Sequence, residues 1–169
     1  MSYARWLVLL VTLSSCRPRA SAPLDAPDVA QLVPRDAAES TLVAPRVIST
    51  PSVVLFWLRG ADTLSGDDRA DTFEDLRYYT SQIAPALEAN DIRLLATKAD
   101  TVYVALPHAQ RRAILLSGLD YPYGYLLIDP GGPERILTGV YADDDLMDEL
   151  RAYFDLPDDS TSAQPRITT

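Results

Sequence analysis

Apolar and polar positions along residues 51–156 follow two different periods, which predict strands and helices in turn. Residues 52–58 form a nearly continuous apolar run that ends at Arg59-Gly60, which is typical of a central strand covered on both faces. A polar loop over 61–70 follows, and apolar residues at spacings of three and four then predict a helix over about 71–90. Pro85 lies inside this helix and should kink it.

Shorter patterns complete the domain. The predicted elements are a strand at 92–98 that 101–105 extends, a helix at 107–116 ended by Gly118, strands at 125–128 and 135–141, and a closing helix from 143 to about 156. Asp129-Pro130-Gly131-Gly132 between the last two strands predicts a hairpin turn. The order β-α-β-α-β-β-α indicates an α/β layer architecture.

A separate apolar segment lies near the N-terminus. Residues 6–13 follow Arg5, and only Thr12 interrupts them. As a helix this segment covers about 12 Å, whereas a bilayer span needs roughly 20 residues. The pattern therefore predicts a signal peptide over residues 1–15 rather than a transmembrane helix.

The residues that end this segment carry a more specific signal. LSSC at 13–16 resembles the bacterial lipobox, in which the cysteine receives lipid. The resemblance implies that Cys16 is the lipidation site and that acyl chains such as palmitate hold the protein to the membrane of the bacterial cell envelope. Arg17, rather than aspartate, follows Cys16, which implies the periplasmic face of the outer membrane. The alternative is an ordinary secretory signal cleaved after Ala20-Ser21-Ala22.

The two ends of the chain differ in composition from the domain. Residues 16–50 contain the lipidated Cys and a Pro/Ala-rich stretch without glycine or aromatic residues, which suits a semi-rigid tether. Within it, 28–33 favours a short helical turn and 41–48 an edge strand. Two alternatives therefore stay open for residues 28–48: they add to the sheet of the domain, or they belong to the tether alone. Residues 157–169 are polar and predict a flexible tail.

Composition excludes several classes of function. The 15 Lys+Arg against 24 Asp+Glu give a net charge of −9, which argues against a nucleic-acid partner. One cysteine excludes an intrachain disulfide, a CxxC pair and an iron–sulfur cluster, and one histidine argues against a histidine-rich metal centre. We therefore expect no metal, no cofactor and no catalytic residue.

Several segments, taken with the predicted element order, resemble the thioredoxin family. They are VLFW at 54–57, QIAPAL at 82–87, LLIDPGG at 126–132 and Gly139. The resemblance implies a thioredoxin-like three-layer α/β domain over residues 51–156, with a mixed sheet of about four to five strands flanked by helices.

The departures from the family bear on function. Its two redox cysteines would fall at Ala61 and Leu64 when counted from the first strand, or at Arg77 and Thr80 when counted back from Pro85. Neither pair contains a thiol, so the chain cannot carry out thiol–disulfide exchange alone. The family's cis-proline falls at Tyr123, one residue after Pro122.

Alternating tyrosines suggest where such a domain would bind. Tyr121, Tyr123 and Tyr125 share one face if the chain is extended. Together with Pro122 and Trp57 they form a candidate docking face for a protein or small ligand. The alternative is that these tyrosines fill space beneath the 59–71 loop.

The sequence thus favours a redox-inactive, non-catalytic binding module anchored in the cell envelope, with an envelope protein as its partner. The alternative is an accessory factor of an envelope thiol-redox or cytochrome-maturation system, whose partner supplies the cysteines. A hydrolase or metal enzyme is the third hypothesis. It would use His108 and Ser117, although no G-x-S-x-G motif frames a serine.

Clustered aspartates raise the question of a cation site. The first cluster is Asp62, Asp67, Asp68, Asp71 and Asp75. It lacks EF-hand spacing and is interpreted as a solvated loop and helix start. The second, at residues 143–145, is interpreted as the N-cap and first turn of the closing helix.

Overall fold

A computed structural model of the 169-residue chain describes residues 28–34 and 47–157. The predicted signal peptide, Cys16, most of the tether and most of the tail lie outside the described residues. The short helical turn predicted at 28–33 is confirmed as the 3-10 helix η1, Val29–Leu32. Asp28 caps it by accepting a hydrogen bond from the Ala30 amide at 3.1 Å.

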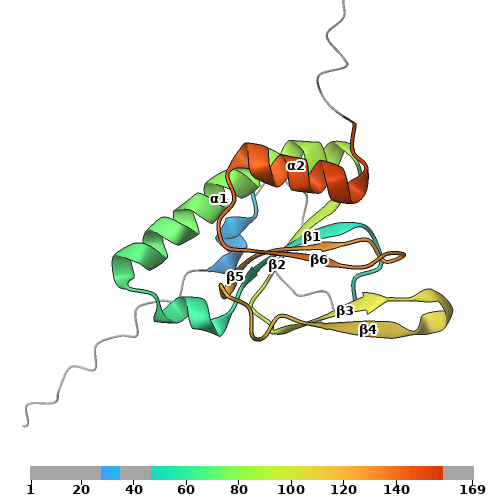
Figure 1. The fold of residues 1–169 in the computed structure, drawn as a ribbon, viewed down its shortest axis with the longest axis horizontal. Coiled ribbons are helices and arrows are strands. Elements are labelled where there is room, and N and C mark those ends of the chain that lie inside the picture. The colour runs from blue at the N-terminus through green and yellow to red at the C-terminus, as the bar shows by residue number, and fades with distance from the viewer. Residues whose placement is uncertain (1–27, 35–46, 158–169) are drawn as a thin grey trace, which may run out of the picture.

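The centre of the fold is a mixed four-stranded sheet in the order β2-β1-β5-β6 (Figure 1). Its strands are β1 Ser52–Trp57, β2 Arg93–Thr97, β5 Tyr123–Ile128 and β6 Arg135–Thr138. β1 and β2 run parallel, whereas β5 is antiparallel to both of its neighbours, β1 and β6. Every residue of β1 is buried, so the prediction of a central strand covered on both faces is confirmed.

Both α-helices pack on one face of this sheet. They are α1, Gly66–Ala89, and α2, Asp143–Phe154. α1 begins earlier than the apolar spacing predicted, because the Ser65 side chain caps it by accepting from the Asp68 amide at 3.3 Å. The helix continues through Pro85, which lies on its exposed side.

The predicted N-cap role of the second aspartate cluster is wrong. Ala142 is the N-cap of α2, and no side chain caps that end. Asp143, Asp144 and Asp145 occupy the first helical turn instead. Carboxylates there stabilise the helix through its dipole rather than by capping a backbone amide.

The helix predicted at 107–116 is wrong. The chain forms a hairpin instead, in which β3, Thr101–Ala105, pairs antiparallel with β4, Arg111–Leu115. The turn between them is the 3-10 helix η3, Pro107–Ala109. His108 and Ala109 have positive φ values of 62° and 60°, and this left-handed backbone turns the chain back on itself. β3 is therefore a separate strand and does not continue β2.

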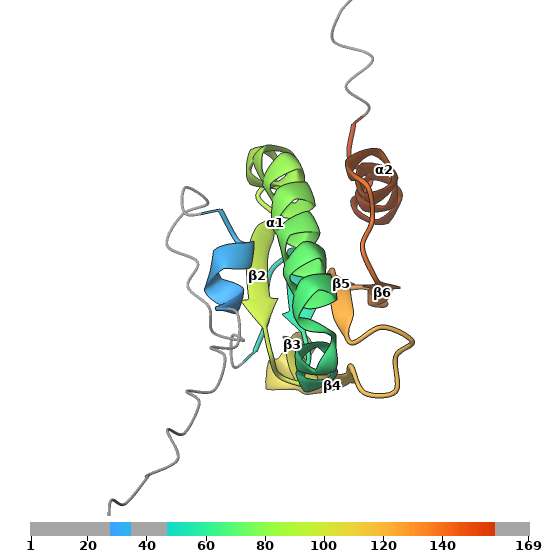
Figure 2. The same ribbon diagram turned by 90° about the vertical axis from the view of Figure 1, so that its left-hand side faces the viewer.

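The sheet separates two hydrophobic cores. Val53, Leu55 and Trp57 point to the core beneath the helices, to which η1 contributes Val29 and Leu32. Figure 2 shows η1 lying beside α1 and β2.

The intervening β1 residues, Val54 and Phe56, point to the core that the hairpin covers. The three layers are therefore helices, sheet and hairpin (Figure 1). Mixed α/β architecture is confirmed, but a hairpin replaces the expected helix on the second face of the sheet.

Candidate functional site

The candidate site is a pocket of about 510 Å³ at the carboxyl ends of β1 and β2, which we call the strand-end pocket. It is lined by Leu58, Arg59, Gly60, Lys98, Ala99, Asp100, Leu116, Ser117, Gly118, Leu119 and Pro122. Ligands of open α/β sheets commonly bind beyond the carboxyl ends of parallel strands.

The topology brings three chain segments to this pocket. β1 and β2 are parallel, so the residues that follow each strand meet at one edge of the sheet. The chain after β4 and before β5 supplies the remaining wall. Two backbone hydrogen bonds join these segments: the Leu58 amide donates to the Pro122 carbonyl at 2.7 Å, and the Leu116 amide donates to the Asp100 carbonyl at 2.8 Å.

The chemistry of the lining suits binding. Leu58 and Leu116 are buried and form an apolar floor, whereas Arg59, Lys98 and Asp100 are exposed. A lining of this kind can contact apolar groups and pair with charges of either sign. The residues lining the strand-end pocket include neither histidine nor cysteine. They therefore offer no imidazole base and no thiol nucleophile.

Three of the five residues predicted to form a docking face are buried. Trp57 and Tyr125 are 0% exposed and Tyr123 is 9% exposed. The Trp57 ring stacks on Tyr123 at 5.7 Å between centroids and meets Phe73 edge-on at 5.5 Å. Its Nε1 donates to Asp62 Oδ1 at 3.0 Å. Trp57, Tyr123 and Tyr125 therefore belong to the core and cannot meet a partner directly.

The exposed remainder of that face is small. Tyr121 is 51% exposed and Pro122 is half-buried. Tyr121 precedes β5, and the bond from it to Pro122 is trans, since the described residues contain no cis peptide bond. Pro122 also lines the strand-end pocket, so the exposed remainder adjoins that pocket.

The Tyr125 side chain links β5 to α1 in the core. Its hydroxyl lies 3.2 Å from Thr80 Oγ1, and both side chains are buried. Burial raises the pKa of Tyr125 to about 12, although the Thr80 hydrogen bond opposes that shift. Thr80 is one of the positions to which a family cysteine was assigned, and it lies in the core.

The first aspartate cluster is spread along the surface. Asp62 accepts the Trp57 hydrogen bond, and Asp68 accepts one from Ser65 Oγ at 2.6 Å. In residues 28–34 and 47–157, no three or more His, Cys, Asp or Glu side chains converge as metal ligands would. The same part of the chain contains no helix long and apolar enough to cross a membrane. His108 lies in the exposed η3 turn, rather than in the helix predicted there.

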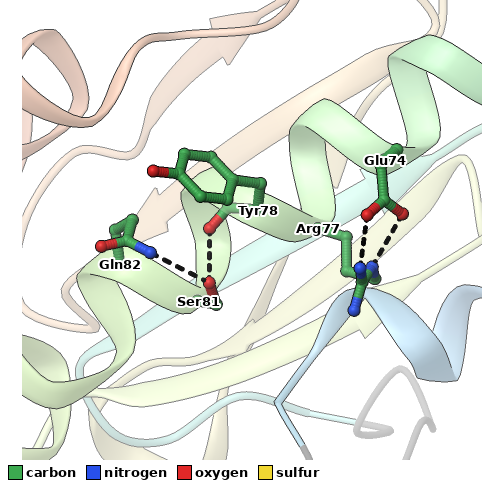
Figure 3. Close-up of polar contacts among 5 residues, drawn as sticks. All are labelled: Glu74, Arg77, Tyr78, Ser81 and Gln82. Carbon is green, nitrogen blue, oxygen red and sulfur yellow. Dashed lines mark hydrogen bonds and ion pairs between the residues drawn. The ribbon is translucent and has the colours of Figure 1, made fainter.

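A second cavity of about 700 Å³ lies between η1 and α1. Its α1 wall includes Glu74, Arg77 and Ser81. Arg77 is ion-paired with Glu74, and Ser81 Oγ donates to the Tyr78 carbonyl at 2.6 Å. Figure 3 shows both contacts. The pairing raises the pKa of Arg77 and lowers that of Glu74. Each of these three polar side chains bonds to a group of the same helix, so we assign no site to this cavity.

Sequence reasoning missed most of the strand-end pocket, including Lys98 and Leu116. One signal was present, because the chain's single lysine is the last residue of a predicted strand, 92–98. No protein-family model, curated protein or solved structure matches the chain.

Proposed function

We propose that the protein is a lipid-anchored component of the bacterial cell envelope whose domain binds a protein or small ligand at the strand-end pocket. In this proposal Cys16 carries the lipid, and residues 51–156 are a redox-inactive thioredoxin-like module. Binding, rather than catalysis, is the function of that module.

The strand arrangement supports the thioredoxin-like part of the proposal. A parallel β1–α1–β2 unit, an antiparallel β5–β6 pair and a closing helix α2 on the α1 side follow the order expected for that family. The hairpin β3–β4 stands where the family has a helix. The chain's one cysteine precedes the domain, which supports a module without redox chemistry of its own.

The single observation that carries the binding function is the strand-end pocket. It combines a buried apolar floor with charged groups of both signs at the rim. Tyr121 adds a half-exposed aromatic ring next to Pro122 in the pocket wall. Aromatic and apolar anchors surrounded by polar groups are typical of protein-binding surfaces.

A matched pair of double variants tests this site. We expect Ser117→Trp with Tyr121→Ser to lower recovery of cross-linked envelope partners at least about tenfold, because the indole fills the pocket and the exposed ring is lost. The control is Ser81→Trp with Tyr78→Ser, which makes the same two changes on the exposed side of α1, where Tyr78 is 54% exposed. Quantitative mass spectrometry of the cross-linked material gives the measurement.

Equal recovery with both double variants would exclude the strand-end pocket as the binding site. The experiment also separates the two functional hypotheses. A structural partner without thiols favours the binding module. A partner with a redox-active cysteine pair, reoxidised more slowly when the pocket is filled, favours the accessory factor.

The anchor is tested separately. We expect Cys16→Ala to abolish labelling by radioactive palmitate and to move the protein out of the membrane fraction, because the thioether-linked lipid has no other attachment point. Ser15→Ala is the control, since it keeps a small residue before the cysteine. A Cys16→Ala protein that is still processed and membrane-bound would contradict lipidation.

A further inference from the structure

The outer edge of the β3–β4 hairpin has a feature that the proposed function does not use. β4 is the last strand of its two-stranded sheet, and within the described residues it pairs with β3 alone. Figure 1 shows it along the lower margin of the molecule. Arg111, Ala113 and Leu115 are all exposed, Leu115 by 64%. The edge is therefore open to another strand.

The phase of the ladder shows which backbone groups face outward. At the two ends of the hairpin, Leu106 donates to Gln110 and Leu116 donates to Asp100, each at 2.8 Å. Pairs in an antiparallel ladder alternate between hydrogen-bonded and non-hydrogen-bonded.

With the observed register, Tyr103–Ala113 is a non-hydrogen-bonded pair, and so are the pairs two residues to either side. The N–H and C=O groups of Arg111, Ala113 and Leu115 therefore point away from β3.

The opposite edge of the hairpin supports this assignment. The Tyr103 carbonyl accepts from the Ile48 amide at 2.8 Å, and the Ala105 amide donates to the Ile48 carbonyl at 2.7 Å. Both β3 residues belong to the non-hydrogen-bonded pairs of the hairpin and direct their backbone groups outward. The residue Ile48 therefore already occupies part of that edge through an isolated β-bridge, and among the described residues β4 forms the edge without a partner.

We propose that β4 pairs antiparallel with β4 of a second copy of this chain, about a two-fold axis at Ala113. The outward groups of residues 111, 113 and 115 then face those of 115, 113 and 111 in the partner. Each of these three pairs exchanges two hydrogen bonds. The result is a continuous four-stranded sheet in the order β3-β4-β4-β3. Such a contact is isologous and closes at two copies.

The side chains of β4 fit this register. Arg111 faces Leu115 of the second copy, and the small Ala113 faces itself, so no arginine lies directly opposite another. The Arg111 guanidinium lies 5.1 Å from the centre of the Tyr103 ring on the same strand pair, which holds it over the exposed face. The aliphatic part of the arginine can then cover the exposed Leu115 of the second copy.

The interface is small, so association should be weak and concentration-dependent. A five-residue strand edge covers less than the roughly 1,200 Å² typical of stable complexes. The test is sedimentation of the full chain carrying Cys16→Ala, so that lipid does not contribute to association. We expect the weight-average mass to rise toward the dimer over about a hundredfold increase in concentration.

Ala113→Pro is the first variant. It removes an N–H that faces the open edge and leaves the β3–β4 ladder its own bonds, and proline is tolerated on edge strands for this reason. We expect the dissociation constant to rise at least about tenfold. Ala113→Ser, which keeps the N–H, is the matched control. Far-ultraviolet circular dichroism checks that the proline variant is folded.

A charge exchange provides a second test that does not depend on proline. Leu115→Arg places arginine opposite Arg111 of the second copy and should weaken dimerisation. Adding Arg111→Glu to it should restore the dimer, because each glutamate then faces an arginine across the axis. A Cys16→Ala chain without further changes that stays monomeric overturns the proposal, even if it binds a different extended partner at β4. A dimer that survives both Ala113→Pro and Leu115→Arg overturns it as well.

Discussion

Gly124→Ala is expected to destabilise the fold by about 3–5 kcal/mol, because it combines a strained backbone with a steric clash. Gly124 lies in β5 between Phe56 on one neighbouring strand and Thr138 on the other. Its φ is +145°, a conformation that residues with a side chain rarely adopt. A Cβ atom there would overlap the Leu137 carbonyl oxygen. Because that oxygen is backbone, it can move only if the β5–β6 pairing shifts.

Chemical denaturation of the wild type and the variant measures this loss. The control is Gly66→Ala, at the start of α1, where an added Cβ meets nothing within 4 Å. Alanine is the better helix former there, so we expect no change or a gain of up to about 1 kcal/mol. Similar free energies of unfolding for Gly124→Ala and the wild type would show that β5 tolerates a side chain at this position.

Alkaline pH is expected to destabilise the protein through Tyr125. Its pKa in the folded protein is raised to about 12 because the phenol is buried, whereas an unfolded tyrosine ionises near 10. Between these values the unfolded chain has lost the proton and the folded chain still holds it. The contribution of Tyr125 to the free energy of unfolding is therefore fully present below about pH 10. It falls by about 1.4 kcal/mol per pH unit between about pH 10 and 12.

Comparison with Tyr125→Phe isolates this contribution. The variant lacks the titrating group, so we expect its free energy of unfolding to decline less steeply between about pH 10 and 12. At neutral pH it should be about 1 kcal/mol less stable, because Thr80 Oγ1 loses its 3.2 Å hydroxyl partner. Tyr78→Phe, at an exposed position, is the control and should follow the wild-type pH dependence. Parallel pH profiles for wild type and Tyr125→Phe would contradict the assignment.

The elements with one clear apolar period were predictable from sequence. β1 is a continuous apolar run, and α1 buries Leu76, Ile83 and Leu87 at spacings of seven and four. The segment 107–116 was misjudged because its alanine, arginine and leucine residues suit a helix locally. Ile114 is buried in the core that the hairpin covers, and this packing favours a strand over a helix. It is a tertiary effect that overrides local propensity. An alanine with positive φ, as at Ala109, has no sequence signal.

The candidate site was less predictable than the fold. The alternation of tyrosines correctly placed Tyr123 and Tyr125 on one face of β5, since both belong to the same core. It does not show whether that face is covered, because the residues that cover it, including Phe73 of α1, come from another part of the chain. The strand-end pocket draws on three segments far apart in sequence. No periodicity within one segment can reveal a pocket of that kind.

The position of Ile48 has a mechanical consequence. Its two backbone hydrogen bonds attach the incoming chain to β3, in the outer hairpin layer, before the chain reaches β1 at Ser52. A pull applied from the N-terminal side therefore loads η1, whose Val29 and Leu32 are packed in the core beneath the helices, and then these two bonds. The central strand, bonded along both sides, is reached only after they break. A domain held by its N-terminus would thus yield at η1 and at this short contact before the strands of its sheet are loaded.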